Sequence, residues 1–434
     1  MRKLRFDALA FVLILALLGT ANLLNVNKPL VSILENRALK TKPRFSLESL
    51  FSGRYCPEFE EYYSDTLILR GKLVKANRDV KGLMSFLGGG VTLITSPENP
   101  TGPETDPGQN PVADGEPGGE EKPGGEGPKK DFGDEQNLGY WLTIDGKAVQ
   151  LFKFNRSSFD YYAEILNRYQ EELGEGVKIF SLIPPTNSEF VQLRKYKGLT
   201  DSQDDAVDYL RSRLRDEIGV VEVFNALKEH GDEYIYFKTD HHWTALGAYY
   251  AYTSFMEATK QSPVPLSRYE AVDLGEFLGS SYTKTLSKEL EKNPDQFIAY
   301  RPLIENEYTM YHGNKESQGH VLDMKYAQDR TNKYLTFISN GGSTWSVVKT
   351  GVKNQKRLLV IKDSFGNALI PFLLPHYEEI YIVDSRFYSI SATGKDIKQF
   401  VQDNGIDEVL FVIYMEDVNW QKFMNGVEGL LGGH

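Results

Sequence analysis

Four short apolar segments limit the folds open to this chain more than any other feature. Each is about as long as a strand and rich in β-branched or aromatic residues, and the residues between the last three segments are patterned as helices. Apolar strands separated by helices predict a parallel sheet covered on both faces. We therefore expect a three-layer α/β/α domain with strands in VKIFSLIPP at 177–185, RLLVIKDS at 357–364, EIYIVDSR at 379–386 and DEVLFVIY at 407–414.

The first 29 residues have the pattern of an export signal. Three basic residues among the first five precede the nearly uncharged run ALAFVLILALLGTANLL at 8–24. Basic residues before an apolar segment hold the N-terminus in the cytoplasm, and this run has the length of a short membrane span, roughly 17 residues. We favour an uncleaved anchor over a signal peptide cleaved near the small residues at 19–21. Either interpretation places residues 30–434 outside the cytoplasm, at the cell membrane or secreted.

Composition divides the remaining chain into three parts. Apolar residues recur at helical spacing from about Phe59 to Phe86, so residues 30–95 are predicted to form a helical lead-in. Pro, Gly, Glu and Asp dominate residues 96–136. Such a segment buries too little apolar surface to offset its chain entropy, and we expect a disordered acidic insert. The α/β domain then comprises residues 137–434.

Charge and cysteine content exclude several classes of protein. The formal net charge is −11, whereas a nucleic-acid-binding protein needs a basic surface to neutralise phosphates, so we expect no nucleic-acid partner. Cys56 is the only cysteine. Neither an intramolecular disulfide nor a cysteine-based zinc site can therefore form, and the neighbours of Cys56 show no recognisable nucleophile motif.

Two motifs carry residues suited to chemistry. Residues 239–244 read TDHHWT, and VIKDSFGNAL at 360–369 places Ser364 where an apolar strand gives way to a helix. In open α/β folds this strand end lies at the ligand-binding edge of the sheet, and a helix N-terminus there favours a developing oxyanion. Taken alone, Ser364 is explained equally well as a helix cap.

The two motifs together suggest nucleophilic catalysis. A nucleophilic serine needs a base, and the base needs a carboxylate that fixes its tautomer. Asp240 and His242 are two residues apart, a spacing that places both side chains on one side of an extended segment. We therefore interpret Ser364 as the nucleophile, His242 as the base and Asp240 as the orienting group. His241 would then point the other way, in a structural or exposed position; its use as the base is the weaker alternative.

A metal site is a competing interpretation of the adjacent histidines. It needs further acidic or histidine ligands, and phosphoesterases that share a DHH string also need an upstream Asp-x-Asp at a strand end. Asp204-Asp205 lies in a helix-like stretch instead. We therefore expect neither a metal nor a cofactor.

The sequence around both motifs resembles the DHHW family. That family is similar to the alginate O-acetylation proteins and belongs with the SGNH hydrolase-like enzymes. The resemblance covers most of the chain except residues 96–136. The similar stretches are YFKTDHHWT at 236–244 with Gly247-Ala248-Tyr249, IKDSFG at 361–366, Glu35-Asn36-Arg37, and residues 51–70.

The resemblance implies a circularly permuted SGNH-like fold. The Asp/His block precedes Ser364, and residues 177–185 resemble a last strand that has moved to the front. The asparagine that usually donates to the oxyanion hole is missing near residues 413–417, and the glycine of the second block is also replaced. The hole would then depend on the Ser364 N–H, with Arg386 or Tyr414.

The resemblance also implies a function. It indicates an extracytoplasmic Ser-His-Asp acyl-transfer enzyme that O-acetylates a cell-surface polysaccharide, with a membrane-bound O-acyltransferase as donor kept close by the N-terminal anchor. The alternatives are a carbohydrate O-acetyl esterase and a non-catalytic scaffold that binds glycan. In the scaffold, exposed Trp243, Tyr388 and Tyr414 would form an aromatic platform.

Overall fold

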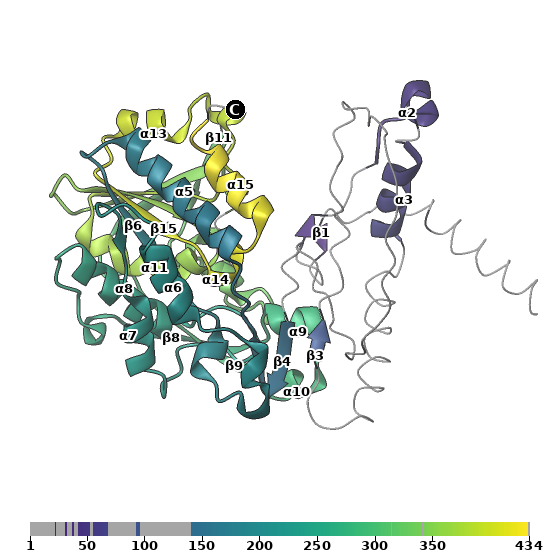
Figure 1. The fold of residues 1–434 in the computed structure, drawn as a ribbon, viewed down its shortest axis with the longest axis horizontal. Helices are drawn as coiled ribbons and strands as arrows, with labels where there is room; N and C mark the ends of the chain where they lie inside the picture. The colour runs from purple at the N-terminus through teal and green to yellow at the C-terminus, as the bar shows by residue number, and fades with distance from the viewer. Residues whose placement is uncertain are drawn as a thin grey trace, which may run out of the picture.

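The computed structural model describes residue 22, residues 31–32, 37–38, 42–52, 55–67 and 93–95, and residues 140–432 apart from 314 and 341. The expected anchor at 8–24, apart from Asn22, and the expected insert at 96–136 lie outside these residues. The described pieces of the lead-in are β1 (Val31–Ser32), β2 (Arg37–Ala38), α2 (Leu47–Phe51), α3 (Tyr55–Asp65) and β3 (Leu93–Thr95) (Figure 1). Within the described part of the chain, no helix is both long and apolar enough to span a membrane.

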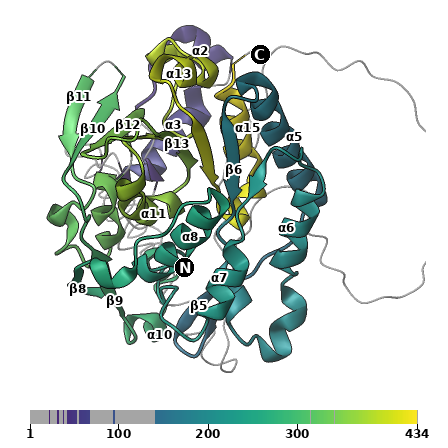
Figure 2. The ribbon, with the colours of Figure 1, turned by 90° about the vertical axis from the view of Figure 1, so that its left-hand side faces the viewer.

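An eight-stranded mixed sheet forms the centre of the domain (Figures 1 and 2). Its strands, in spatial order, are β11 (Lys315–Gly319), β10 (Asn306–His312), β12 (Trp345–Thr350), β14 (Glu379–Val383), β13 (Arg357–Lys362), β15 (Glu408–Val412), β6 (Lys178–Leu182) and β7 (Gly219–Val220). The strands from β14 to β7 are parallel to one another. Strands β10, β11 and β12 extend the sheet in antiparallel pairings.

The four apolar segments form four adjacent strands, β14, β13, β15 and β6, as predicted. Burial explains why they were recognisable, because β15 is buried at every residue and β13 at every residue but the first. The expectation of a wholly parallel sheet was wrong. Strands β10 to β12 pair antiparallel, and β11 is exposed along nearly its whole length. They therefore lack the continuous apolar run that marks a strand of a parallel sheet.

Helices cover both faces of the parallel strands (Figure 2). On one face, Tyr162 of α5 (Arg156–Leu173) is hydrogen-bonded through its hydroxyl with Ser181 Oγ at 3.0 Å. On the other face, Phe255 of α8 (Ala245–Ala258) packs edge-on against Phe180, with ring centroids 5.5 Å apart. Phe180 and Ser181 are consecutive in β6, so their side chains point to opposite faces of the sheet. The three-layer arrangement is therefore present around these strands.

The remaining helices and strands surround these layers. The helix predicted at 244–260 is α8, and the Thr244 side chain accepts the Gly247 N–H at its start. The other α-helices are α6 (Gln203–Arg211), α7 (Val223–Glu229), α9 (Ser280–Thr285), α10 (Lys288–Glu291), α11 (Phe365–Leu373), α12 (Ile390–Thr393), α13 (Ile397–Asn404), α14 (Met415–Val418) and α15 (Gln421–Gly429). Two smaller antiparallel sheets contain β3 with β4 (Tyr140–Ile144) and β5 (Lys147–Gln150), and β8 (Ala271–Phe277) with β9 (Asp295–Tyr300).

The strand register places three predicted site residues along one edge of the sheet. Ile361 of β13 pairs with Val383 of β14, and Lys362 pairs with Val412 of β15. Arg386, Ser364 and Tyr414 therefore follow the carboxyl ends of three neighbouring strands. This is the edge at which open α/β sheets bind their ligands.

Candidate active site

Ser364 lies in the turn between β13 and α11. Its backbone is right-handed helical, and its side chain makes no capping hydrogen bond. Asp363 does the capping instead, because its carboxylate accepts the Phe365 N–H at 2.7 Å and also accepts the Tyr414 N–H. The interpretation of Ser364 as a helix cap was therefore wrong, and its hydroxyl is left for another partner.

The TDHHWT residues form a tight loop, not the extended segment that we expected. An antiparallel bridge between Tyr236 and Trp243 closes the loop. Inside it, the His242 N–H donates to Asp240 Oδ1 at 2.9 Å. Aspartate side chains readily accept the N–H two residues further on, which favours a turn over an extended strand. The turn still brings Asp240 and His242 together.

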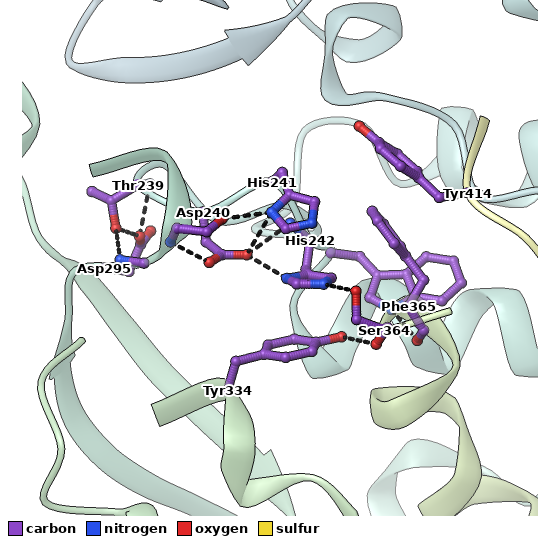
Figure 3. Close-up of polar contacts among 12 residues, drawn as sticks. Thr239, Asp240, His241, His242, Asp295, Tyr334, Ser364, Phe365 and Tyr414 are labelled. Atoms are coloured by element: carbon purple, nitrogen blue, oxygen red, sulfur yellow. Dashed lines mark hydrogen bonds and ion pairs between the residues drawn. The ribbon is translucent and has the colours of Figure 1, made fainter. Parts of the chain in front are cut away.

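Asp240, His242 and Ser364 are joined in a line of hydrogen bonds, which we call the triad (Figure 3). Asp240 Oδ1 lies 2.5 Å from His242 Nδ1, and His242 Nε2 lies 2.7 Å from Ser364 Oγ. Burial raises the pKa of Asp240, but the charge and hydrogen bond of His242 lower it more, and it lies well below its usual value. An ionised carboxylate only accepts hydrogen bonds, so Nδ1–H donates to Asp240, and in the neutral form of the ring Nε2 is left to accept from the Ser364 hydroxyl.

His241 does not point away from His242, so that expectation was wrong. The two rings lie side by side, with centroids 3.8 Å apart and planes tilted by 37°. His241 Nδ1 is hydrogen-bonded with Ser280 Oγ at 2.5 Å, while the Ser280 N–H donates to Asp240 Oδ2 at 2.6 Å. Burial and the nearby His242 lower the pKa of His241 well below its usual value, so the ring is neutral.

Asp295, at the start of β9, anchors the loop and was missed from the sequence. Its buried carboxylate accepts the Lys238 N–H at 2.6 Å and the Thr239 N–H at 2.8 Å. It also accepts from the hydroxyls of Thr239 and Tyr234. Four donors on one carboxylate fix the backbone just before Asp240. No local pattern marks Asp295, because its partners lie more than fifty positions earlier in the chain.

Tyr334 supports the triad from a third segment and was also missed. Its ring stacks on His242, with centroids 3.8 Å apart and planes only 9° from parallel. Its hydroxyl donates to the Ser364 carbonyl oxygen at 3.1 Å (Figure 3). Tyr334 therefore contacts both the base and the backbone of the serine turn, and it restricts the motion of the imidazole ring.

A buried ionic network connects β13 with β14 beneath the serine turn. Lys362 Nζ lies 3.3 Å from Asp384 Oδ2. Arg386 binds the same carboxylate with two donors, Nε to Oδ1 at 2.8 Å and Nη2 to Oδ2 at 2.6 Å. Burial alone would raise the pKa of Asp384. The positive charges of Lys362 and Arg386 lower this pKa by more than burial raises it, so the carboxylate is ionised. The network fixes Arg386 one strand away from Ser364.

The expected aromatic platform of Trp243, Tyr388 and Tyr414 was wrong. Their exposed fractions are 0%, 7% and 3%. Trp243 Nε1–H donates to the Phe365 carbonyl at 3.1 Å, and the Tyr388 hydroxyl donates to the Lys395 carbonyl at 2.9 Å. All three rings pack into the core. Tyr388 and Tyr414 follow buried strands, and Trp243 packs against Phe365 at the start of α11.

Tyr414 lies near the serine, but its hydroxyl is already engaged. Its ring stacks on Phe365, with centroids 4.2 Å apart. The hydroxyl donates to Gln150 Oε1 at 2.8 Å, and Figure 3 shows it turned away from Ser364. The Tyr414 hydroxyl is thus poorly placed to serve as an oxyanion donor, unlike the Ser364 N–H at the helix start.

The ligand atoms of Asp240, His241 and His242 lie within 4.8 Å of one another, which is close enough for a metal ion. Each of the three side chains is already hydrogen-bonded. Asp240 accepts three N–H groups, His242 Nε2 accepts from Ser364, and His241 Nδ1 is paired with Ser280. A metal would have to displace these bonds, so the arrangement favours proton transfer to and from Ser364.

Gly279 is the position at which a single methyl group should disturb the triad most directly. A Cβ there would lie 2.3 Å from both Cβ and Oδ2 of Asp240. We predict that Gly279→Ala displaces the carboxylate and slows hydrolysis of a test ester, 4-nitrophenyl acetate, at least tenfold, since catalytic geometry is sensitive to shifts of about 1 Å. Gly351→Ala is the matched control, because a Cβ there meets nothing within 4 Å. Ester hydrolysis by both variants tests this; equal rates would contradict the steric argument.

Fold and site together define an α/β domain whose sheet edge carries a serine, a histidine and a carboxylate in hydrogen-bonding order. The model of the DHHW protein family matches residues 112–383. The chain therefore belongs to the DHHW family. No match was found among curated protein sequences.

Solved structures show the same fold. A DHHW family protein from Eubacterium siraeum is 29% identical, with a TM-score of 0.60 over 69% of this chain and 98% of that one. Bacillus cereus PatB1, solved with a sulfonyl adduct, is 21% identical, with a TM-score of 0.55 over 66% of this chain and 97% of that one. The O-acetyltransferase domain of Pseudomonas putida AlgJ is 12% identical, with a TM-score of 0.38 over 67% and 96%, a likeness too weak to argue from.

Proposed function

We propose that this protein is a serine-dependent acyl-transfer enzyme that moves an acetyl group onto a hydroxyl of a cell-surface polysaccharide. One observation carries the proposal, the unbroken line of hydrogen bonds from Asp240 through His242 to Ser364. The serine is partly exposed whereas its base and carboxylate are buried, so an ester can reach the nucleophile while the proton pathway stays protected.

The triad supports a two-step reaction. Ser364 Oγ attacks the acetyl carbonyl carbon as its proton passes to His242 Nε2. The bond to the donor oxygen breaks, that oxygen takes the proton from His242, and Ser364 is left acetylated. A sugar hydroxyl then gives its proton to His242 as its oxygen attacks the acetyl carbon. Ser364 Oγ is released and recovers the proton, and the acetyl ester is now on the sugar.

Two neighbouring groups support the charged intermediates. Asp240 balances the positive charge that His242 gains in each step. The backbone N–H of Ser364, at the N-terminal end of α11, is our choice for the developing oxyanion. Arg386 is the second candidate, since Asp384 holds its guanidinium on the neighbouring strand.

The same steps with water in place of the sugar hydroxyl would make an acetylesterase. We favour transfer, because the apolar segment at 8–24 would tether the enzyme beside a membrane-bound O-acyltransferase that supplies the acetyl group. The proposed location is the outer face of the cell membrane, with the α/β domain outside the cytoplasm. A non-catalytic scaffold is disfavoured, since it would not require a complete triad.

We also propose that the domain is a circularly permuted SGNH-like fold. The Asp240–His242 loop precedes the serine strand β13 in the chain. Strand β6 precedes both, yet in the sheet it lies beside β15, the strand that comes last in the chain. The permutation would place β6 where an unpermuted chain has its final parallel strand.

A covalent-labelling experiment tests the proposed nucleophile. The purified full-length protein is incubated with 4-nitrophenyl acetate or with phenylmethanesulfonyl fluoride, chosen because PatB1 takes a sulfonyl adduct. Peptide mass spectrometry should find one modified residue, Ser364, because ordinary serines are too weakly nucleophilic to react. The same protein in urea is the control and should stay unlabelled. Labelling elsewhere, or equal labelling of folded and unfolded protein, would contradict the proposal.

A further inference from the structure

Two exposed aromatic side chains lie at the same sheet edge as Ser364. Large exposed apolar side chains are few in the described part of the chain. Phe387, which follows β14, is 46% exposed, and Trp420, at the start of α15, is 36% exposed. Neither was singled out by the sequence, because exposure depends on how the helices that follow the strands pack.

The two aromatic residues are linked through Arg386 and the buried ring of Phe423. The Arg386 guanidinium carbon lies 5.6 Å from the Phe387 ring centroid and 5.8 Å from that of Phe423. The Trp420 ring stacks on Phe423, with centroids 5.9 Å apart and planes 22° from parallel. Phe423 is buried and connects the exposed groups. We call Phe387, Arg386 and Trp420 the rim triplet.

Arg386, the polar member of the rim triplet, follows the strand next to that of the nucleophile. Ile361 of β13 and Val383 of β14 are paired in the sheet. Ser364 lies three residues after Ile361, and Arg386 lies three residues after Val383. Neighbouring strands are about 5 Å apart. Lys362 and Asp384 contact each other across the same two strands, at 3.3 Å. Arg386 therefore lies at the same sheet edge as Ser364, and a ligand of several sugar rings can span from it to the neighbouring strand.

The chemistry of the rim triplet fits a sugar chain. Asp384 accepts from Nε and Nη2 of Arg386, and no acceptor within the described residues is hydrogen-bonded to Nη1. That donor is fixed in position and available to a hydroxyl or carboxylate oxygen. Aromatic rings offer flat apolar faces to the C–H side of a pyranose, while a polar group beside them binds its hydroxyls. Apolar faces around a fixed donor are therefore suited to a ligand with both kinds of surface.

We propose that the rim triplet is the acceptor subsite, which holds a glycan with one hydroxyl over acetylated Ser364. This inference rests on the proposed function. It adds the residues that favour a sugar hydroxyl over water as the acceptor of the acetyl group. Phe387 and Trp420 pack against sugar rings, and Arg386 Nη1 donates to a ring substituent. The platform expected from the sequence thus has different members, at the rim and not in the core.

Transfer and hydrolysis measured together test this subsite. The full-length protein receives 4-nitrophenyl acetate as donor and either chitohexaose or hexagalacturonate as acceptor. Nitrophenolate release reports total turnover, and mass spectrometry reports acetylated oligosaccharide. We expect the ratio of transfer to hydrolysis to fall about tenfold in Phe387→Ala and in Trp420→Ala. Leu199→Ala, which truncates a side chain of similar exposure (42%), should keep the wild-type ratio.

The outcomes separate the subsite from the catalytic proposal. Wild-type protein that releases nitrophenolate but acetylates neither oligosaccharide would overturn the subsite and leave the nucleophile intact. An unchanged ratio in both aromatic variants would also overturn it. Transfer to hexagalacturonate alone would support the subsite and show that Arg386 pairs with a carboxylate, whereas transfer to chitohexaose would show that hydroxyl contacts suffice. No nitrophenolate release at all would contradict the proposed function instead.

Discussion

Ser364→Ala is expected to hydrolyse 4-nitrophenyl acetate at least about 10³-fold more slowly than the wild-type protein. The variant keeps the turn between β13 and α11, because Asp363 and not Ser364 caps the helix. It loses the hydroxyl that lies 2.7 Å from His242 Nε2. Because the change is small and the cap is independent of it, the thermal midpoint should stay close to that of the wild type. kcat/KM from initial rates is the measurement.

The matched control for this variant is Ser212→Ala. Ser212 is exposed after α6, and its hydroxyl donates only to the Tyr209 carbonyl. Its loss should leave kcat/KM unchanged. If Ser364→Ala kept activity within tenfold of the wild type, another nucleophile or a directly activated water would have to replace the covalent step.

Asp240→Asn should produce the second large effect, a decrease in kcat/KM of about 10³- to 10⁴-fold. Asp240 Oδ1 lies 2.5 Å from His242 Nδ1 and holds the ring proton on that nitrogen. This leaves Nε2 free to accept from the Ser364 hydroxyl. An amide at this position can turn its NH₂ group toward Nδ1, which would favour the other tautomer. The proton would then lie on Nε2, and the base could no longer accept from the serine.

The Asp240→Asn experiment is best made as a pH profile of kcat/KM with a matched carboxylate variant. Asp201→Asn serves as the control, because Asp201 also accepts a backbone N–H, from Phe154, and a cationic donor, Lys153 Nζ, but not at the triad. Asp240→Asn should be slow at every pH, since the amide favours the wrong tautomer whatever the pH. Recovery to wild-type rates at high pH would show that Asp240 acts through charge alone.

The parts of this molecule that were predictable carry continuous local patterns. Strands β13 and β15 are buried along almost their whole length, and unbroken apolar runs reveal such strands in a sequence. The order of residues around Ser364 likewise predicted a strand, a turn and a helix. These features depend on neighbours in the chain, so sequence periodicity is sufficient to find them.

The parts that were missed depend on contacts between distant segments. Asp295 and Tyr334 reach the triad from β9 and from the short helix Lys333–Thr336, and nothing in their neighbouring residues distinguishes them from other polar and aromatic side chains. The exposed edge strand β11 and its half-buried neighbour β10 lacked the apolar run on which the prediction relied. The assumed exposure of Trp243 was wrong for the same reason, since burial is decided by packing between segments.

His242 and Ser364, which we propose to react together, are separated by 122 positions along the chain. His242 is fixed by a loop closed near α8, whereas Ser364 is fixed by a strand in the middle of the sheet. Contacts at such separation form late, because the loop between them must close before they gain anything. A newly made or partly unfolded chain therefore carries an ordinary alcohol at residue 364. In the proposed mechanism the serine would become reactive only in the folded domain, because its base reaches it only there.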